Sequence, residues 1–247
     1  MKNIKNMIPN AITSTGILLG MFAISLVFRG QYTEAAWLLL LCTVLDKLDG
    51  TAARHLNATS QMGIQLDSLS DLITFIVAPA ILWMAVLTGA EGPFEQGSFY
   101  QLITLLSLGL YVVAGALRLA KFNTLATETP SDFFSGVPTT MGGAHLVSLY
   151  LALTVSLDVQ VATYAMFVPP LFAIIGILMV SSFLYPKFKM RRSRLINIFQ
   201  QANFAVSVVF IVVRVAPAYL FLMGAIYTVF GMVWANLLSK PAEQVQD

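Results

Sequence analysis

Residues 72–90 of the chain read LITFIVAPAILWMAVLTGA, a run without a charged side chain. A helix needs about 20 mostly apolar residues to cross the hydrocarbon core of a bilayer, and this run approaches that length. Further uncharged runs cover residues 6–28, 99–117, 133–157, 159–186, 195–213 and 215–239. The runs are continuously apolar and do not alternate with polar residues, which excludes the strands of an outer-membrane barrel. The sequence therefore predicts an all-α polytopic membrane protein.

The composition of the whole chain supports this prediction. Of 247 residues, 57% are apolar and only 11% are charged, and the mean hydropathy is +0.79. Soluble domains carry about 25% charged residues. The many large apolar side chains exclude a disordered chain, and a net charge of +2 offers no basic surface for nucleic acid. One cysteine, Cys42, cannot form the disulfide framework of a small secreted domain.

A shorter apolar run, residues 35–45, ends at Asp46. We count it as a span because the flanking helices could not otherwise alternate between the two membrane faces. A single membrane domain over residues 1–247 is expected, preceded at residues 1–10 by a short interfacial segment. The expected helices cover approximately residues 8–28, 33–55, 67–89, 99–124, 138–157, 160–184, 195–214 and 217–238.

Basic residues are distributed unevenly over the connections between these helices. If the N-terminus is cytosolic, 12 of the 14 Lys and Arg residues lie on the cytosolic side, and only Arg29 and Arg214 lie on the other. Because cytosolic loops carry the excess of Lys and Arg, both termini are predicted to be cytosolic. The basic loop at residues 185–194 is expected to fix this topology and to contact anionic membrane lipids.

Four aspartates lie within 26 residues of this apolar chain: Asp46, Asp49, Asp67 and Asp71. A carboxylate in or near hydrocarbon is costly and usually marks a functional site. Asp46 and Asp49 are three residues apart, and Asp67 and Asp71 are four apart, so each pair shares a helix face. If the segment at residues 50–66 folds the chain back, the two faces meet and the four carboxylates converge.

Four converging carboxylates cannot all stay ionised without nearby cations. Hard oxygen ligands of this kind select Mg²⁺ or Mn²⁺, and two such ions would leave coordination positions open for a diphosphate. The small residues Gly50, Ala53 and Gly63 would let a diphosphate approach the backbone. Arg54 could donate a pair of hydrogen bonds to a phosphate.

Two other interpretations of the aspartates are ion pairing and a cation site in a transporter. Only Lys47 and Arg54 lie close enough in sequence to pair with four carboxylates. A transporter would more naturally place its charged site near the membrane midplane on broken helices. The aspartates are instead expected near the cytosolic face, which favours an enzyme working at the membrane surface.

The segment from Asp46 to Asp71 resembles the signature of the CDP-alcohol phosphotransferases, D-x2-D-G-x2-A-R-x8-G-x3-D-x3-D, at all eight fixed positions. The resemblance implies a membrane enzyme that releases CMP from a CDP-linked lipid and attaches an alcohol to the phosphate. It implies that the four aspartates hold two metal ions and that Asp71 is also the general base. It suggests a homodimer. A prokaryotic inner membrane is expected, and the distribution of basic residues places the active site on its cytosolic side. The residues assigned to the CDP site are Asp49, Gly50, Ala53, Arg54, Gly63 and Asp67.

Three further stretches resemble the phosphatidylserine synthase branch of that family, which implies CDP-diacylglycerol and L-serine as substrates. Ile76, Lys121 and Thr140 stand where this branch usually has Gly, Arg and Pro. Glycerol phosphate, inositol phosphate and choline therefore stay open as alternative acceptors. The three stretches are residues 9–13, residues 66–71 continuing into 78–79, and residues 117–123 followed by 134–138.

Arg118 and Lys121 lie three residues apart near the cytosolic end of the fourth expected helix. Arg can bind a carboxylate through two parallel hydrogen bonds, so this pair is a candidate clamp for an amino-acid acceptor. The alternative is that both residues only anchor the helix at the cytosolic face. Asn123 could orient the acceptor or cap the helix.

Overall fold

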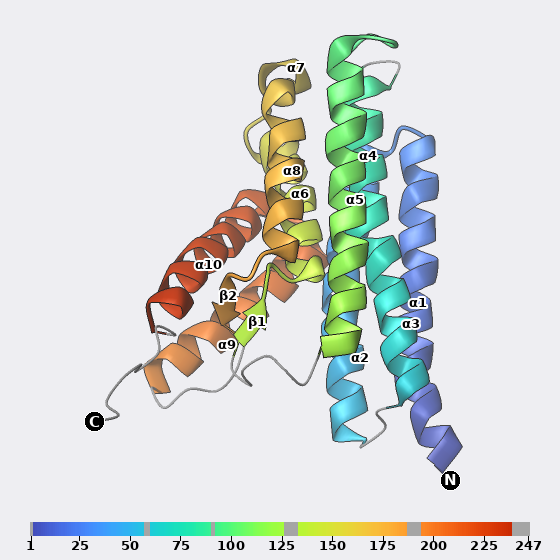
Figure 1. Ribbon diagram of the computed structural model, residues 1–247, viewed down its shortest axis with the longest axis vertical. Helices are drawn as coiled ribbons and strands as arrows, with labels where there is room; N and C mark the ends of the chain where they lie inside the picture. The colour runs from blue at the N-terminus through green and yellow to red at the C-terminus, as the bar shows by residue number, and fades with distance from the viewer. Residues whose placement is uncertain (1, 57–59, 90–91, 126–132, 187–193, 239–247) are drawn as a thin grey trace, which may run out of the picture.

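The computed structural model describes residues 2–56, 60–89, 92–125, 133–186 and 194–238 (Figure 1). Its described part is almost entirely helical, which confirms the all-α prediction. Several helices follow one another without a break, so that they form eight continuous segments, matching the eight expected. The segments are α1 (Lys2–Phe28); α2 (Tyr32–His55); α3 (Gln61–Asp71) with η1 (Leu72–Val77) and α4 (Ala78–Thr88); α5 (Phe99–Leu125); α6 (Thr139–Leu151) with η2 (Ala152–Ser156); α7 (Val161–Tyr164) with η3 (Ala165–Phe167) and α8 (Val168–Val180); α9 (Arg194–Val213); and α10 (Pro217–Leu238).

Within the described residues, five segments are long and apolar enough to cross a membrane: 7–28, 61–88, 99–124, 161–180 and 217–237. The chain is thus an integral membrane protein. The second segment, α2, does not qualify because it carries Asp46, Lys47 and Asp49 in its apolar stretch. The total of eight spans and the cytosolic placement of the termini stay predictions.

Two helix starts differ from those expected. α1 runs without a break from Lys2 through Pro9, so residues 2–10 form its first turns, and their expected place at the membrane interface stays a prediction. α3 begins at Gln61 instead of residue 67, because the Ser60 side chain accepts a hydrogen bond from the Gly63 amide at 3.0 Å and so caps the helix. The chain therefore reverses over a few residues after α2, and Gly63 is helical.

The sixth segment ends at Val180, four residues earlier than expected. Leu184–Pro186 instead forms a short strand, β2, which pairs antiparallel with β1 (Phe133–Ser135). This two-stranded sheet was not predicted from the sequence. It joins the chain just before α6 to the chain just after α8. Residues 187–193 of the expected basic loop lie outside the described part of the chain.

Figure 1 shows α1, α2, α4 and α5 running side by side, with α3 continuing the line of α4. The end of α2 and the start of α3 lie at one end of the molecule, at the bottom of Figure 1, and α5 ends above them, beside α3. α9 and α10 are inclined to the other helices. All four aspartates belong to α2 and α3, so the site lies toward this end.

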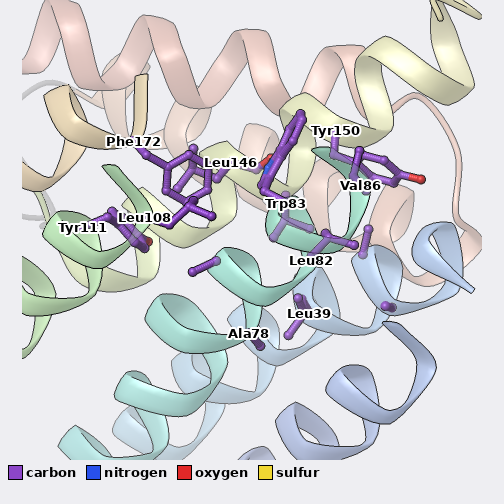
Figure 2. Packing of buried hydrophobic residues seen from close by; sticks show 14 of the residues in the cluster. Leu39, Ala78, Leu82, Trp83, Val86, Leu108, Tyr111, Leu146, Tyr150 and Phe172 are labelled. Atoms are coloured by element: carbon purple, nitrogen blue, oxygen red, sulfur yellow. The ribbon is translucent and has the colours of Figure 1, made fainter. Parts of the chain in front are cut away.

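Aromatic packing fixes α4 against α6 and α8 (Figure 2). Trp83 is fully buried, and its ring meets those of Tyr150 and Phe172 edge-on, at centroid distances of 5.7 and 6.5 Å. The indole N–H of Trp83 donates a hydrogen bond to the Leu146 carbonyl at 3.0 Å. This core holds in place the helical segments whose ends contribute to the site.

Pro79 disrupts the regular helix that continues from Asp71. Because Pro79 has no N–H, the carbonyl of Phe75, four residues earlier, lacks its usual helical partner. The helix widens into a π-helical turn at η1, and the Tyr111 hydroxyl of α5 donates to the Phe75 carbonyl at 2.7 Å. Gly143 of α6 lies so close that a Cβ there would be 2.4 Å from the same oxygen. α5 and α6 thus both hold the turn that follows Asp71.

Candidate active site

The four aspartates converge as their spacing predicts. Carboxylate oxygens of Asp46, Asp49 and Asp67 all lie within 4.8 Å of one another. Asp71, one turn further along α3, lies beside Asp46, and their carboxylates interact. The short connection between α2 and α3 therefore brings the two acidic helix faces together.

The carboxylates differ in their exposure to solvent. Asp67 is exposed and Asp46 is half-buried, whereas Asp49 and Asp71 are buried, at 6% and 9% exposed. The cluster is thus open at Asp67 and closed at Asp71. A charged, water-soluble group can approach the open end, while Asp71 lies in a part of the site that excludes most water.

Three threonines from other helices donate hydrogen bonds to the carboxylates. The Thr13 hydroxyl of α1 is 2.8 Å from Asp49 Oδ2, and the Thr139 hydroxyl of α6 is 2.9 Å from Asp71 Oδ2. Thr140, also on α6, lies 3.4 Å from Asp46 Oδ2. Hydrogen bonds to a charged group stabilise that group more strongly than bonds between neutral groups.

The sequence did not assign a role to these threonines. Thr13 lies in one of the stretches that resemble the phosphatidylserine synthase branch, whereas Thr140 stands where that branch usually has Pro. Thr139 directly follows Pro138, and neither residue by itself predicts a contact with a carboxylate. The role of Thr139 becomes visible only in the tertiary structure, where the start of α6 contacts Asp71 at the end of α3.

The donor set fits hard divalent cations. All the ligand atoms are carboxylate oxygens, which Mg²⁺ and Mn²⁺ prefer. Asp71 Oδ1 is buried and has no hydrogen-bond partner among the described residues. A buried carboxylate oxygen without a partner is costly, and a cation or a substrate hydroxyl would satisfy it.

The small residues expected at the CDP site lie on α2 and α3, close to the aspartates. Gly50 directly follows Asp49 on α2 and is half-buried. At Gly63, a Cβ would be 3.2 Å from the Asn10 side chain of α1, so the absence of a side chain lets α1 approach α3 closely. Ala53 and Arg54 belong to the last turns of α2, but their side chains lie outside the described part of the chain.

The residues proposed for the acceptor separate into different environments. Arg118 is buried, 8% exposed, and donates from Nη1 to Thr139 Oγ1 at 3.4 Å. Lys121 is exposed, although it is only three residues away. Asn123 donates to the Ser68 hydroxyl at 3.0 Å and so ties α5 to α3. Of these three residues, Arg118 is the one that bonds to Thr139, which in turn bonds to Asp71.

The chain resembles known proteins over most of its length. The sequence model of a family described as CDP-alcohol phosphatidyltransferase matches residues 6–213. A Helicobacter pylori protein named CDP-diacylglycerol–serine O-phosphatidyltransferase is 33% identical over 94% of this chain and 92% of its own length. A protein of the same name from Bacillus subtilis is 37% identical over 58% of this chain and 75% of its own. Another from Methanocaldococcus jannaschii is 29% identical over 92% of both chains.

Proposed function

The chain belongs to the CDP-alcohol phosphatidyltransferase family, and we propose that it makes phosphatidylserine and CMP from CDP-diacylglycerol and L-serine. The observation that carries this proposal is the juxtaposition of the aspartate cluster with the buried Arg118: three carboxylates lie within 4.8 Å of one another, and Asp71 lies beside Asp46 and near the arginine. The cluster suits a diphosphate neutralised by cations, and Arg118 suits the carboxylate of an amino acid. The names of the relatives support the same substrates.

In the proposed reaction, the serine hydroxyl oxygen forms a bond to the phosphorus of the phosphatidyl group. Its proton passes to Asp71, and the bond from that phosphorus to the oxygen retained by CMP breaks with its electron pair. Asp71 suits the role of general base because its buried Oδ1 has no hydrogen-bond partner among the described residues. This oxygen can therefore accept a hydrogen bond, and then the proton, from the serine hydroxyl.

We infer that Asp46, Asp49, Asp67 and Asp71 hold two divalent ions, Mg²⁺ or Mn²⁺. Such ions supply positive charge to the diphosphate and to the departing CMP. The nucleotide would enter at the open end of the cluster, near Asp67. There Gly50 and Gly63 lack side chains, and Arg54 stands in the last turn of α2. Asp49 and Ala53 complete the proposed CDP site.

The proposed surroundings of the enzyme follow from its substrates. CDP-diacylglycerol is a membrane lipid and serine is soluble, so the site must open where the membrane meets water. We propose a prokaryotic inner membrane with the site on its cytosolic side, as the distribution of basic residues predicts, and a homodimer, as the family resemblance implies.

The test is an acceptor screen with purified protein in detergent or lipid nanodiscs. With CDP-diacylglycerol, Mg²⁺ or Mn²⁺ and labelled serine, we expect CMP release together with labelled lipid. Turnover with glycerol phosphate, inositol phosphate or choline but not with serine would mean that this other alcohol is the acceptor. No CMP release with any acceptor, and no CDP binding, would favour a cation transporter.

A further inference from the structure

Thr139 connects two buried charged side chains. Its hydroxyl donates to Asp71 Oδ2 at 2.9 Å and accepts from Arg118 Nη1 at 3.4 Å. Thr139 itself is 1% exposed. A hydroxyl has a single proton to donate, so the bond to Asp71 and the bond from Arg118 together give it a defined orientation.

This arrangement uses one polar atom of each charged group and leaves another open. Asp71 Oδ1 and Arg118 Nε are both buried, and neither has a hydrogen-bond partner among the described residues. Asp46 adjoins Asp71 and their carboxyl groups interact, but once metal ions are bound both are ionised and neither has a proton to donate to the other. Buried polar atoms are nearly always paired, so one open acceptor and one open donor linked through Thr139 require an explanation.

The two open atoms match the chemistry of the proposed acceptor. L-serine carries a hydroxyl, which must lose a proton, and a carboxylate, which needs a donor. Asp71 Oδ1 can accept the first and Arg118 Nε can donate to the second. Each carboxylate oxygen has two lone pairs, so an ion held by Asp71 does not exhaust Oδ1.

We propose that Thr139 is a positioning residue for the acceptor. It holds Asp71 through Oδ2 and Arg118 through Nη1, so that Oδ1 and Nε stay available to the hydroxyl and the carboxylate of one small molecule. This inference rests on the proposed function. It adds α6 to the elements that recognise the acceptor.

The fold holds Thr139 firmly enough for this role. Pro138 precedes it with φ −56° and ψ 139°, and its carbonyl accepts the Gly142 amide at 2.9 Å, so α6 starts at Thr139. One turn further, Gly143 packs directly on the backbone of Phe75 in η1. Because η1 immediately follows Asp71, the same contact fixes α6 relative to Asp71.

The test compares Thr139→Val, which removes the hydroxyl at nearly constant volume, with Thr139→Ser, which keeps it. Loss of a hydrogen bond to a charged group predicts a fall of about 10- to 100-fold in kcat/KM for serine in Thr139→Val. We expect the KM for CDP-diacylglycerol and the affinity for CDP, measured by calorimetry, to stay within about twofold. Thr139→Ser should recover most of kcat/KM.

The matched control is Thr104→Val. Thr104 is fully buried on α5, and its hydroxyl donates to the carbonyl of Tyr100 in its own helix at 2.8 Å. This variant should behave as wild type in serine turnover. Melting curves in detergent show whether each variant folds, and CDP binding shows the same for the site itself.

Unchanged kinetics in Thr139→Val would overturn the inference, as would equal losses in the Val and Ser variants. A matching loss of CDP affinity would assign Thr139 to the nucleotide site instead. If wild type uses a different alcohol, the serine assignment fails, and Thr139 is judged by the same comparison with that alcohol. If no alcohol reacts, both proposals fail.

Discussion

The four aspartates are chemically identical, yet the fold gives them different surroundings. Asp67 faces solvent, whereas Asp71 is buried beside Asp46 and bonded by Thr139. Asp49 is also buried, but it is bonded from α1 through Thr13. Substitution of single aspartates should therefore separate binding from chemistry.

Asp71→Asn should reduce serine transfer by about 1000-fold or more, because an amide cannot accept the proton of the serine hydroxyl. Binding of CDP and of Mn²⁺, measured by calorimetry and electron paramagnetic resonance, should largely persist. Asp49→Asn and Asp46→Asn should instead weaken the binding of both. Normal turnover by Asp71→Asn would rule out its role as general base.

Arg118→Ala should raise the KM for serine by about 10-fold or more and leave that for CDP-diacylglycerol nearly unchanged, because the lost group binds the acceptor carboxylate. Lys121→Ala should have a smaller effect because Lys121 is exposed. Steady-state kinetics with each substrate varied in turn make the measurement.

A suitable control for the arginine change is Arg214→Ala. Arg214 forms an exposed ion pair with Glu34 in the first turn of α2, more than three turns before Asp46, and such pairs contribute about 0–1 kcal/mol. If Arg118→Ala raised both KM values equally, Arg118 would belong to the phosphate site. Equal effects of Arg118→Ala and Lys121→Ala would restore the two-residue clamp.

At the scale of helices, the site depends on how closely α6 approaches η1. The π-helical turn exists because Pro79 denies the Phe75 carbonyl its usual partner, and Tyr111 supplies a replacement. Gly143 permits the contact because it has no side chain. Thr139 reaches Asp71 only if this contact is kept.

Gly143→Ala should therefore push α6 away from η1. We expect a loss of about 1–3 kcal/mol in the free energy of unfolding from overpacking, together with slower serine transfer. The matched control is Gly109→Ala on α5, where an added Cβ meets nothing within 4 Å and helix propensity improves. Melting temperatures in detergent compare the two variants, and equal values would contradict the close packing of α6.

For the whole molecule, the orientation of the chain in the membrane is still a prediction. The sequence places the connection after α4 outside the cytosol and the start of α3 inside it. Cys42 is buried, so its replacement by alanine gives a background for single-cysteine labelling. Gln96 and Gln61 are exposed positions on the two sides.

In intact cells, a membrane-impermeant maleimide should label Gln96→Cys and spare Gln61→Cys. After the membrane is made permeable, both should react. The opposite pattern would mean that the protein has the inverse orientation in the membrane, with the four aspartates on the side away from the cytosol. Labelling of both positions before permeabilisation would mean that the third segment does not span.

The sequence by itself determined the helical segments and the convergence of the four aspartates. Uncharged runs are visible in one dimension because a bilayer demands about 20 apolar residues, whatever their neighbours in space. The convergence of the aspartates was predictable because three- and four-residue spacing fixes a helix face. Segment ends were less predictable. The start of α3 depends on the Ser60 cap, and the end of α8 depends on pairing between β2 and β1.

Only the tertiary structure decided which polar side chains meet the carboxylates. Thr13 and Thr139 are separated from their aspartates by 36 and 68 residues, and no local periodicity links them. It also separated Arg118 from Lys121, since helix packing buries one face of α5 and exposes the other. Hydrogen bonds between helices depend on which faces pack together, and that is a property of the assembled fold.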